Sequence, residues 1–435
     1  MSSEWPILRL GDHVDACLGK MLDAKKNKGE PQPYLGNSNV RWGEFDLDDL
    51  AEMRFEAHED ERYSLQRGDL VVCEGGEPGR CAIWEGLPGI KIQKALHRIR
   101  PKSGFNNYYL FYWFCLAAKT GKLDPHFTGT TIKHLTGKAI ASLEVPCPPI
   151  ATQIALVNVL RSLDDRITLL RETNATLEAI AQALFKSWFV DFDPVRAKQE
   201  GRAPEGMSDA TAALFPDSFE ESELGLVPKG WRVAHVGDVV DTVGGGTPDT
   251  KDVGYWEPAE YCWTTPKDLS GISSPVLLNT ERKLSAKGVA KISSGLLPAG
   301  TLLMSSRAPI GYLAITQTPM AINQGYIAIP PSGTLPPLYM LHWCQHNMDT
   351  IKNHANGSTF MEISKKAFRP LPVLVPPAEV LAEFVVLADA LFARLVENEK
   401  QAQTLATLRD TLLPRLISGQ LRLPEAEALI EEATA

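Results

Sequence analysis

Features that would assign this 435-residue chain to a membrane or a secreted protein are missing. No apolar run reaches the ~20 residues that a membrane-spanning helix needs, and residues 1–16 lack the basic and apolar layout of a signal peptide. The seven cysteines form no Cys-x-x-Cys pair, which disfavours a zinc ribbon and a disulfide framework. We therefore expect a cytoplasmic protein without a membrane part.

The motifs of common catalytic sites are missing as well. The chain contains no GxxxxGK(S/T), HExxH or GxSxG pattern, and no Asn/Asp-Pro-Pro-aromatic tetrad of an amino-methyltransferase. The glycine-rich VGGGTPDT at Val243 lacks the features of a nucleotide-binding loop and is interpreted as a turn. His342 and His346 have helical metal-pair spacing, but no further ligand cluster lies nearby in the sequence. We expect neither catalytic residues nor a metal site on this chain.

Charge is unevenly distributed along the sequence. The net charge of −9 argues superficially against a nucleic-acid partner. Residues 68–150, however, contain ten Lys and Arg against six Asp and Glu, whereas residues 201–230 contain two against six. A basic region within an acidic chain can still contact phosphates, so the overall charge does not decide the matter.

The sequence contains one unit twice. WPILRLGDHVD at Trp5 recurs as WRVAHVGDVVD at Trp231, and GDLVVCEGGEPGRCAI at Gly68 recurs as GTLLMSSRAPIGYLAI at Gly300. A third string, HFTGTTIKH…VPCPP, recurs as HANGSTFME…VLVPP. The three pairs are 226, 232 and 228 residues apart, so the order is kept and only loop lengths differ. Such self-similarity predicts two copies of one fold.

Each copy is expected to combine a globular domain with a long helix. Short β-type runs such as GDLVVCE, GTLLMSS and GYIAIP alternate with helix-like runs, and Pro-Pro pairs at Pro148 and Pro376 suit the start of a helix. We predict a duplicated α/β (α+β) fold, its two similar domains separated by two long antiparallel coiled-coil helices. The predicted parts are a first domain at 1–150, a helical spacer at 151–195, a linker at 196–230, a second domain at 231–377, a second helical spacer at 378–420 and an acidic tail at 421–435.

Both helical parts carry an apolar stripe whose members are alternately four and three residues apart, which is the coiled-coil pattern. The first stripe comprises Leu156, Leu160, Leu163, Ile167, Leu170, Asn174, Leu177, Ala181, Leu184 and Trp188. The second, 228 residues later, comprises Phe384, Ala388, Leu391, Leu395, Asn398, Ala402, Leu405, Arg409, Leu412 and Leu416. Sustained over at least four heptads, the pattern predicts helices roughly 50 to 55 Å long.

The two stripes fit one another when they are placed antiparallel with Asn174 opposite Asn398. Large residues then face small ones, and the two polar interruptions share one layer that sets the register of the helices. Arg409 opposite Leu163 is a poor match, and its long side chain is expected to reach solvent. The alternative, two amphipathic helices that each pack on their own domain, remains open.

The whole chain resembles the specificity (S) subunit of type I restriction-modification enzymes, in which two target-recognition domains alternate with two helical regions. The strings that carry the resemblance are LFKSWFVDFDPV, SELGLVPKGW, GGGTPDT with YW and WTTPKDL after it, SSRAPIG and LLPRLISGQL. PPIATQIALV is similar to the start of the family's helical region, although the second copy has Leu381 where the first has Gln153. This difference weakens any functional role for Gln153.

The resemblance implies that each domain reads half of a split double-stranded DNA target, while the helices set the gap between the halves. It further implies a complex with two methyltransferase (M) subunits and with restriction-translocase (R) subunits. S-adenosylmethionine, ATP and Mg would be bound by those partners, and this chain would hold no cofactor.

Base readout normally uses Arg, Lys, Asn or Gln from loops, with basic and hydroxyl side chains on the phosphates. On this basis we predict DNA-contacting residues in both domains. They are Arg80, Gln93, Lys94, Thr130, Thr131 and Lys133 in the first domain and Arg307, Asn323, Gln324, Ser358 and Thr359 in the second. For each of them a structural role remains open; Asn323, for example, is a residue type that also caps turns.

The stretch LFKSWFVDFDPV sets Asp191 and Asp193 beside several aromatics, as a catalytic carboxyl pair would be. Leu184 and Trp188 belong to the inward stripe, however, and Pro194 is expected to end the helix. An aspartate before a proline at a helix end is more typical of a turn. We predict instead that surplus aromatics dock a methyltransferase subunit, with the site formed by Phe185, Phe189, Phe192 and Asp193.

Two functions of other classes are compatible with the sequence. A self-contained DNA-modifying or DNA-cleaving enzyme with an unrecognised site would act on DNA without partners, which incubation with labelled S-adenosylmethionine would expose. A coiled-coil scaffold without a DNA role would bind methyltransferase partners but select nothing from a random DNA pool.

Overall fold

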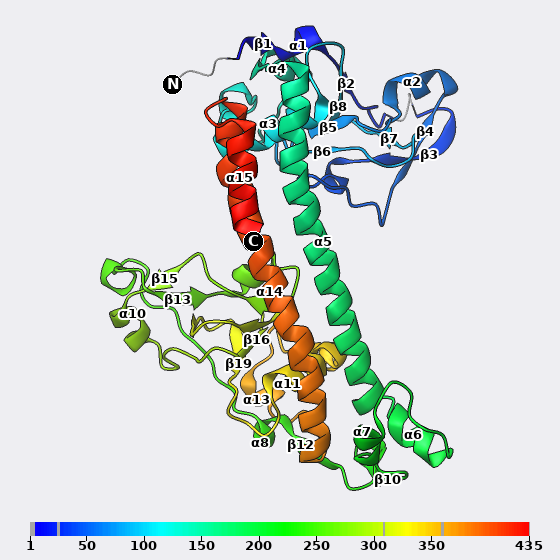
Figure 1. Ribbon diagram of the computed structural model, residues 1–435, viewed down its shortest axis with the longest axis vertical. Helices are drawn as coiled ribbons and strands as arrows, with labels where there is room; N and C mark the ends of the chain where they lie inside the picture. The colour runs from blue at the N-terminus through cyan, green and yellow to red at the C-terminus, as the bar shows by residue number, and fades with distance from the viewer. Residues whose placement is uncertain (1–4, 24–26, 308, 358–360, 435) are drawn as a thin grey trace. The chain divides into compact units, whose positions relative to one another are not determined.

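The computed structural model describes residues 5–23, 27–307, 309–357 and 361–434 (Figure 1). The chain divides into two compact units: unit 1 contains Met1–Ile167 and Thr404–Ala435, and unit 2 contains Thr168–Gln403. Each unit has one globular domain, domain 1 or domain 2, and one part of each of two long helices. These helices are α5 (Ile150–Phe189) and α14 (Ala378–Ile417).

Domain 1 is built on a four-stranded sheet of order β2-β8-β5-β6 and a three-stranded sheet of order β4-β3-β7, with β1 paired to β9. All four residues of β5 are buried, as their apolar run predicts. The strands are β1 (Ile7–Arg9), β2 (Val14–Leu18), β3 (Glu30–Leu35), β4 (Glu52–Phe55), β5 (Leu70–Cys73), β6 (Cys81–Ile83), β7 (Lys91–Ile92), β8 (Leu96–Pro101) and β9 (Glu144–Pro146).

Short helices connect these strands, and α3 packs against β5, β6 and β8 of the larger sheet. Asn106 begins α3, because its side chain accepts hydrogen bonds from the backbone N–H groups of Tyr108 and Tyr109. The Tyr109 hydroxyl donates to the Pro146 carbonyl at 2.8 Å and so ties α3 to β9. The helices are α1 (Leu10–His13), α2 (Asp60–Tyr63), α3 (Asn107–Lys119) and α4 (Gly137–Ser142), with 3-10 turns η1 (Asn37–Asn39), η2 (Ala57–Glu59) and η3 (Asp124–His126).

Domain 2 has sheets of order β14-β17-β16-β19 and β15-β13-β18, with β12 paired to β20; the hairpin β10-β11 precedes it. The strands are β10 (Phe219–Ser222), β11 (Gly225–Pro228), β12 (Arg232–His235), β13 (Tyr261–Thr264), β14 (Val276–Leu277), β15 (Lys283–Leu284), β16 (Leu302–Ser305), β17 (Leu313–Thr316), β18 (Ala321–Ile322), β19 (Tyr326–Ile329) and β20 (Pro372–Val375). The helices of unit 2 other than α5 and α14 are α6 (Asp193–Gln199), α7 (Asp209–Ala213), α8 (Val236–Val239), α9 (Pro266–Leu269), α10 (Ala286–Lys291), α11 (Pro337–His346), α12 (Met348–Asn353) and α13 (Lys365–Phe368), with the 3-10 turn η4 (Val253–Tyr255).

The two domains share the central pattern of strand pairing. β3 pairs parallel with β7 as β13 does with β18, and β5 lies between β8 and β6 as β16 lies between β19 and β17. Tyr339 of α11 repeats the hydrogen bond of Tyr109, since its hydroxyl donates to the Leu374 carbonyl at 2.8 Å. Strand β14, which pairs parallel with β17, extends the sheet of domain 2. The predicted duplicated α/β fold is confirmed.

Helices α5 and α14 pack antiparallel, as predicted. In unit 2 the Nδ2 of Asn398 donates to the Oδ1 of Asn174 at 2.9 Å, and the Nδ2 of Asn174 donates to the Leu395 carbonyl at 3.3 Å. The rings of Trp188 and Phe384 have centroids 6.2 Å apart. The stripe residues are buried in both helices apart from four half-buried ones: Leu177, Leu184, Leu391 and Arg409.

Arg409 does not extend to solvent as expected. In unit 1 its Nη1 donates to Asp164 at 2.6 Å and its Nη2 to Asp410 at 2.9 Å. The Tyr112 hydroxyl donates to the second oxygen of Asp164 at 2.6 Å, and Lys119 donates to Asp410 at 2.7 Å. The guanidinium is therefore held by carboxylates that also attach α3 to both long helices.

The segments that follow the two long helices differ from what the sequence predicted. Helix α5 ends at Phe189, and Phe192 has a left-handed backbone with φ 57°. Pro194 lies in the first turn of α6, where its missing N–H breaks no helical hydrogen bond, so it begins a helix rather than ending one. The segment predicted as an acidic tail contains helix α15 (Leu423–Thr434).

None of the described helices is both long enough and apolar enough to cross a bilayer.

Candidate nucleic-acid interface

Three loops of domain 1 converge beside the ends of its strands. They are residues 74–80 after β5, residues 93–95 after β7 and residues 128–134 before α4. The backbone N–H of Glu74 donates to the Ala95 carbonyl at 2.8 Å, and that of Leu135 donates to the Glu74 carbonyl at 2.7 Å. We call this set of loops the three-loop cluster of domain 1.

Domain 2 has the same three-loop cluster; the described parts of its loops are residues 306–307 and 309–311, residues 323–325, and residues 356–357 and 361–362. The backbone N–H of Ser306 donates to the Gly325 carbonyl at 2.8 Å, and that of Ile363 donates to the Ser306 carbonyl at 3.0 Å. These bonds occupy the positions of the two bonds in domain 1. The repeat in the sequence therefore places corresponding loops together in both domains.

A glycine lets a fourth segment run against the middle loop in each domain. A Cβ on Gly19 would lie 2.4 Å from the Gln93 carbonyl oxygen, and one on Gly245 would lie 1.9 Å from the Ile322 carbonyl oxygen. Real Cβ atoms do not approach carbonyls so closely, so both positions require glycine. The next residue then bonds to the strand end in both domains: the N–H groups of Lys20 and Gly246 donate to Ile92 and Ile322, each at 3.0 Å.

The side chain of Arg80, one of the predicted DNA contacts, is mostly bound by other residues of domain 1. Its side chain is 17% exposed and lies 3.3 Å from Glu77. Its Nη2 donates to the Asn37 carbonyl at 2.9 Å. This geometry gives Arg80 a role in holding loop 74–80 against the turn at Asn37.

The other residues predicted in domain 1 lie on the three-loop cluster. Gln93 is half-buried and Lys94 exposed in the middle loop. Thr130, Thr131 and Lys133 are exposed in a loop closed by paired backbone hydrogen bonds between residues 128 and 134. The cluster thus presents hydroxyl, amide and ammonium groups together.

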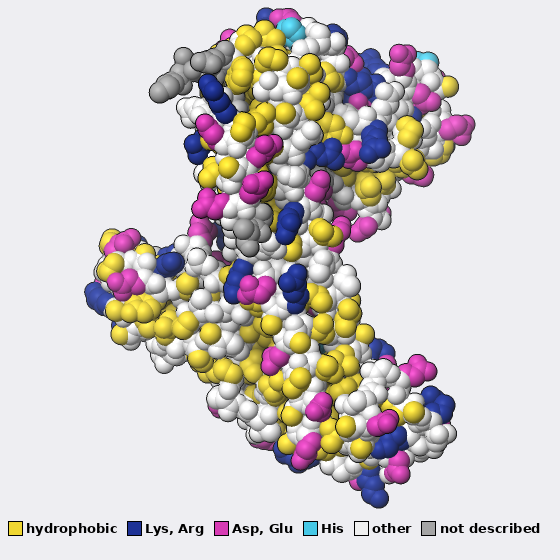
Figure 2. Space-filling view, viewed as in Figure 1, with side chains coloured by type: hydrophobic (Ala, Val, Ile, Leu, Met, Phe, Trp, Pro, Cys, Tyr) yellow, Lys and Arg dark blue, Asp and Glu magenta, His cyan; other side chains and the backbone are white. Residues whose placement is uncertain are grey.

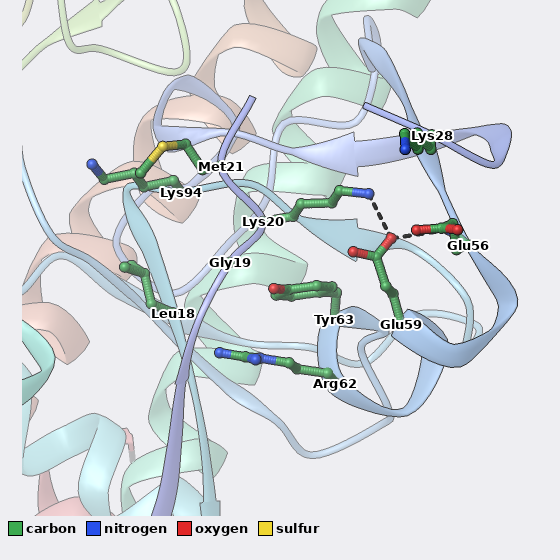
Figure 3. A pocket seen from close by; sticks show the side chains of 10 residues that line it. All are labelled: Leu18, Gly19, Lys20, Met21, Lys28, Glu56, Glu59, Arg62, Tyr63 and Lys94. Atoms are coloured by element: carbon green, nitrogen blue, oxygen red, sulfur yellow. Dashed lines mark hydrogen bonds and ion pairs between the residues drawn. The ribbon is translucent and has the colours of Figure 1, made fainter. Parts of the chain in front are cut away.

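A hollow of about 370 Å³ adjoins the middle loop of domain 1 (Figure 3). Its basic lining residues are Lys20, Lys28, Arg62 and Lys94, and its acidic ones are Glu56 and Glu59. Lys20 donates to Glu59 at 2.5 Å. Burial alone would raise the pKa of Glu59, but the hydrogen bonds from Lys20 and from the Glu56 backbone outweigh it and lower that pKa. Lys20 and Glu59 therefore remain an ion pair of opposite charges, and Lys28, Arg62 and Lys94 outnumber the one other acidic lining residue, Glu56.

In domain 2 the described candidates also lie on the three-loop cluster. Arg307 is half-exposed, with Nη1 3.7 Å from a carboxylate oxygen of Glu362. The Asn323 side chain accepts from the backbone N–H of Gly325 at 2.8 Å, so the structural role that was left open for it is present. Gln324 accepts from the Thr247 hydroxyl at 2.7 Å, which leaves its amide N–H groups to donate. Ser358 and Thr359 lie outside the described residues.

The aromatics predicted to dock a partner lie in the interior of unit 2. Phe185, Phe189 and Phe192 are 3%, 5% and 9% exposed. Phe189 packs edge-on against Tyr339 and Phe384, with centroids 5.1 and 5.0 Å away. Rings that are buried within one chain offer no side-chain surface to another, so their predicted docking role is corrected to core packing. Asp193, the fourth residue of that prediction, is exposed at the start of α6.

Two residues with potentially reactive side chains, Cys73 and His342, are buried. Burial raises the pKa of the Cys73 thiol to about 11, despite the neighbouring Arg80, so the thiol stays protonated near neutral pH. His342, considered above for a metal pair, is buried with its Nδ1 2.9 Å from Gln345, and burial lowers its pKa. Figure 2 shows acidic and basic side chains interspersed on the face that it draws, without one continuous basic surface.

Comparison with known proteins settles the family. The family model described as "Type I restriction modification DNA specificity domain" matches the chain twice, at residues 2–179 and 228–407. This chain belongs to that family. It is the DNA-target specificity subunit of a type I restriction-modification system, and such subunits are non-catalytic. The reactive groups and catalytic cofactors of these enzymes reside on the other subunits.

Individual relatives agree with this assignment. The specificity subunit is 34% identical over 366 residues to the type I restriction enzyme MjaIX specificity subunit of Methanocaldococcus jannaschii, covering 82% of this chain and 79% of that one. It is 28% identical over 338 residues to the HindI specificity subunit of Haemophilus influenzae, covering 67% and 72%. The crystal structure of the type I S subunit from M. genitalium matches 95% of this chain and 96% of its own, with a TM-score of 0.54 and 15% identity. That last likeness concerns the fold alone.

Several polar residues of the specificity subunit escaped sequence reasoning. Lys20 and Arg62 line the hollow of domain 1, and Thr247 bonds to Gln324 in domain 2. Arg282 lies on two tryptophans of domain 2. For Thr247 a signal existed, because it lies in the glycine-rich VGGGTPDT string. For the others, the contacts join segments whose proximity no local pattern indicates.

Proposed function

We propose that this specificity subunit reads a split double-stranded DNA target, with domain 1 contacting one half and domain 2 the other. The observation that carries the proposal is the repeated three-loop cluster. Two similar clusters that differ in their polar side chains suit two half-sites of different sequence. Gln93 and Lys94 occupy in domain 1 the place that Asn323 and Gln324 occupy in domain 2.

The residues proposed to contact DNA are those that project from the clusters. In domain 1 these are Gln93, Lys94, Thr130, Thr131 and Lys133, and in domain 2 Arg307 and Gln324. Arg80 and Asn323 support the loops through the hydrogen bonds described above. Ser358 and Thr359 stay in the proposal on their place in the repeat, since they correspond to Thr130 and Thr131.

The proposed parts of the chain follow the repeat. Residues 1–150 and 231–377 are the two target-recognition domains, and 151–195 and 378–420 are the helical spacers that set the gap between half-sites. Residues 196–230 link the first spacer to the second domain, and residues 421–435 follow the second spacer. The hydrogen bond between Asn174 and Asn398 supports a role of this pair in setting the register of the spacers.

The partners proposed are two methyltransferase subunits, which bind S-adenosylmethionine, and restriction subunits, which use ATP and Mg. Exposed apolar residues on the long helices support partner docking there. On α14, Val386 and Leu387 are 65% and 43% exposed, and on α5, Ile180 is 49% exposed. Exposed apolar residues that form one contiguous patch are typical of a protein interface.

The methylation pattern of the host genome tests this function. Deleting the gene for this chain should abolish one adenine-methylated motif that has two defined parts and a fixed gap. The purified chain alone, given DNA and labelled S-adenosylmethionine, should transfer no label, whereas the complex with methyltransferase subunits should transfer it. Persistence of every methylated motif after deletion would contradict the proposal.

A further inference from the structure

Domain 2 carries an arginine whose guanidinium lies over two tryptophans. The Cζ atom of Arg282 is 3.8 Å from the ring centroid of Trp256 and 4.9 Å from that of Trp263. The two indoles meet edge to face, with centroids 5.2 Å apart and planes at 84°. A guanidinium over an indole is attracted by the π-system, most strongly for tryptophan.

Trp256 and Trp263 form a platform under Arg282, and both tryptophans are held by hydrogen bonds. The Nε1 of Trp256 donates to the Asp249 carbonyl at 3.1 Å, and that of Trp263 donates to the Gly246 carbonyl at 3.2 Å. Trp263 is 2% exposed, and its backbone N–H donates to the Arg282 carbonyl at 3.2 Å. The side chain of Arg282 is therefore held before any ligand arrives, which reduces the conformational entropy lost on binding.

The N–H groups of this guanidinium are free. Arg282 is exposed, and among the described residues its side chain has no hydrogen-bond or ion-pair partner. Other arginines differ: Arg80 is held by Glu77, Arg100 by Asp69, and Arg307 lies near Glu362. An arginine that is oriented by stacking but has no acceptor is prepared to bind one.

Arg282 also adjoins the three-loop cluster of domain 2. Trp263 bonds to Gly246, and the N–H of Gly246 bonds to Ile322 at the entrance to the middle loop. The N–H of Asn323 in that loop donates to the carbonyl of Thr264, the residue after Trp263. Two separate paths of hydrogen bonds, one through Gly246 and one through Thr264, thus connect the arginine platform to the loop of Gln324.

We propose that Arg282 donates a bidentate pair of hydrogen bonds to DNA at the second half-site, an inference that rests on the proposed function. The planar guanidinium presents a fork of N–H donors that matches two neighbouring acceptors. DNA offers such acceptors either as phosphate oxygens or as the O6 and N7 atoms of guanine. Trp256 and Trp263 are positioning residues that keep the fork facing outward.

The repeat confines this contact to one half-site. In domain 1 the backbone position of Arg282 is occupied by Ala51, whose carbonyl accepts from Tyr34 as that of Arg282 accepts from Trp263. The alanine side chain offers no donor, so no equivalent of the Arg282 guanidinium stands at this position of domain 1. The first half-site is therefore an internal control for every experiment on Arg282.

The test compares variants of the full complex with methyltransferase subunits. Arg282→Ala should weaken binding of the cognate target by about 10- to 100-fold. Arg282→Lys should not restore it, because lysine keeps the charge but has no planar fork. Trp256→Ala, which retains the arginine, should lose part of the affinity. Arg232→Ala, which removes an exposed arginine from β12, is the matched control and should bind like the wild type.

Two further measurements distinguish the acceptors. For a phosphate contact, Arg282→Ala weakens binding to all targets equally and lowers the salt dependence of the binding constant by about one unit of slope. For a guanine contact, methylation of a randomised library becomes tolerant at one position of the second half-site. The first half-site stays unchanged in both cases.

The inference is overturned if Arg282→Ala equals Arg232→Ala in affinity, salt slope and pattern, if Arg282→Lys binds like the wild type, or if the first half-site changes. The thermal midpoint of each variant shows whether it is folded. If Arg282→Ala unfolds, Arg282→Lys is the variant on which the inference is tested. A wild-type complex without sequence-specific binding would instead contradict the proposed function.

Discussion

Arg409 occupies a core position between α5 and α14 because carboxylates meet it there. Asp164 and Asp410 flank the apolar stripe rather than belong to it, so a count of heptad positions gives no sign of them. The same Asp164 accepts from Tyr112 of domain 1. At the scale of residues, the heptad pattern predicts on which face of a helix a side chain lies. Its hydrogen-bond partners depend on neighbours from other elements, which the pattern does not show.

Removing Asp164 should destabilise unit 1. Asp164→Ala leaves the half-buried Arg409 and the buried Tyr112 each without one acceptor. The cost should be about 1 to 2 kcal/mol, since the side chains of Arg409 and Asp164 are about a third exposed. Chemical denaturation followed by fluorescence measures this free energy of unfolding. Asp165→Ala, which removes an exposed carboxylate from the next position, is the control and should change it little. Equal stability of the two variants would refute the role of the network.

Glu178 should make unit 2 less stable as pH rises. Burial raises its pKa, although hydrogen bonds from Gln345 and Gln182 oppose the shift. A carboxyl with a raised folded-state pKa contributes stability below its unfolded-state pKa, and that contribution is lost as pH rises through the folded-state pKa. Glu178→Gln keeps an oxygen for Gln345 but carries no charge. It should raise the thermal midpoint at pH 8 and leave it nearly unchanged at pH 4; an unchanged midpoint at pH 8 would contradict this.

At the scale of elements, the heptad pattern predicted the helix pair but not the other contacts of α5. A heptad pattern for two helices assigns one inward stripe to each helix. Phe185 and Phe189 lie outside that stripe, so the pattern left them as candidates for contact with a partner. In the structure α11 packs on that second face, where Phe185 and Tyr339 meet edge to face at 5.2 Å. The prediction of a docking site failed because apolar residues outside a stripe serve an internal domain contact as readily as an external one.

The buried pair of Asn174 and Asn398 should fix the register of the two helices at a cost in stability. Asn398→Ala removes the donor to Asn174 and should cost about 1 to 3 kcal/mol. Replacing both by leucine should instead raise the free energy of unfolding, because two buried amides no longer need partners, while allowing the helices to slide.

Spin labels at the exposed positions Lys186 and Glu383 in unit 2 measure the sliding. The double-leucine variant should broaden the distance distribution relative to the wild type, and Arg394→Ala, which removes an exposed charge from α14, should not. A narrow, unchanged distribution in the double-leucine variant would show that register is set elsewhere.

At the scale of the molecule, the internal repeat was the most informative signal in the sequence. It predicted two equivalent domains, whereas the grouping of loop 93–95 with loops 74–80 and 128–134 became visible only in the structure. The platform of Arg282 could not be found in this way, because Ala51 stands at the same place in the other copy. Repeats indicate what two domains share, while specificity lies in what differs between them.

Exchange of one domain tests the central claim, that each domain reads one half of the target. Residues 231–377 are replaced by the second domain of a family member with a different target, and DNA methylated by the reconstituted complex is sequenced. The account predicts that the first half of the motif is kept, the second half is replaced and the gap is unchanged. A complex that assembles and methylates, yet keeps its original motif or changes both halves, would contradict it.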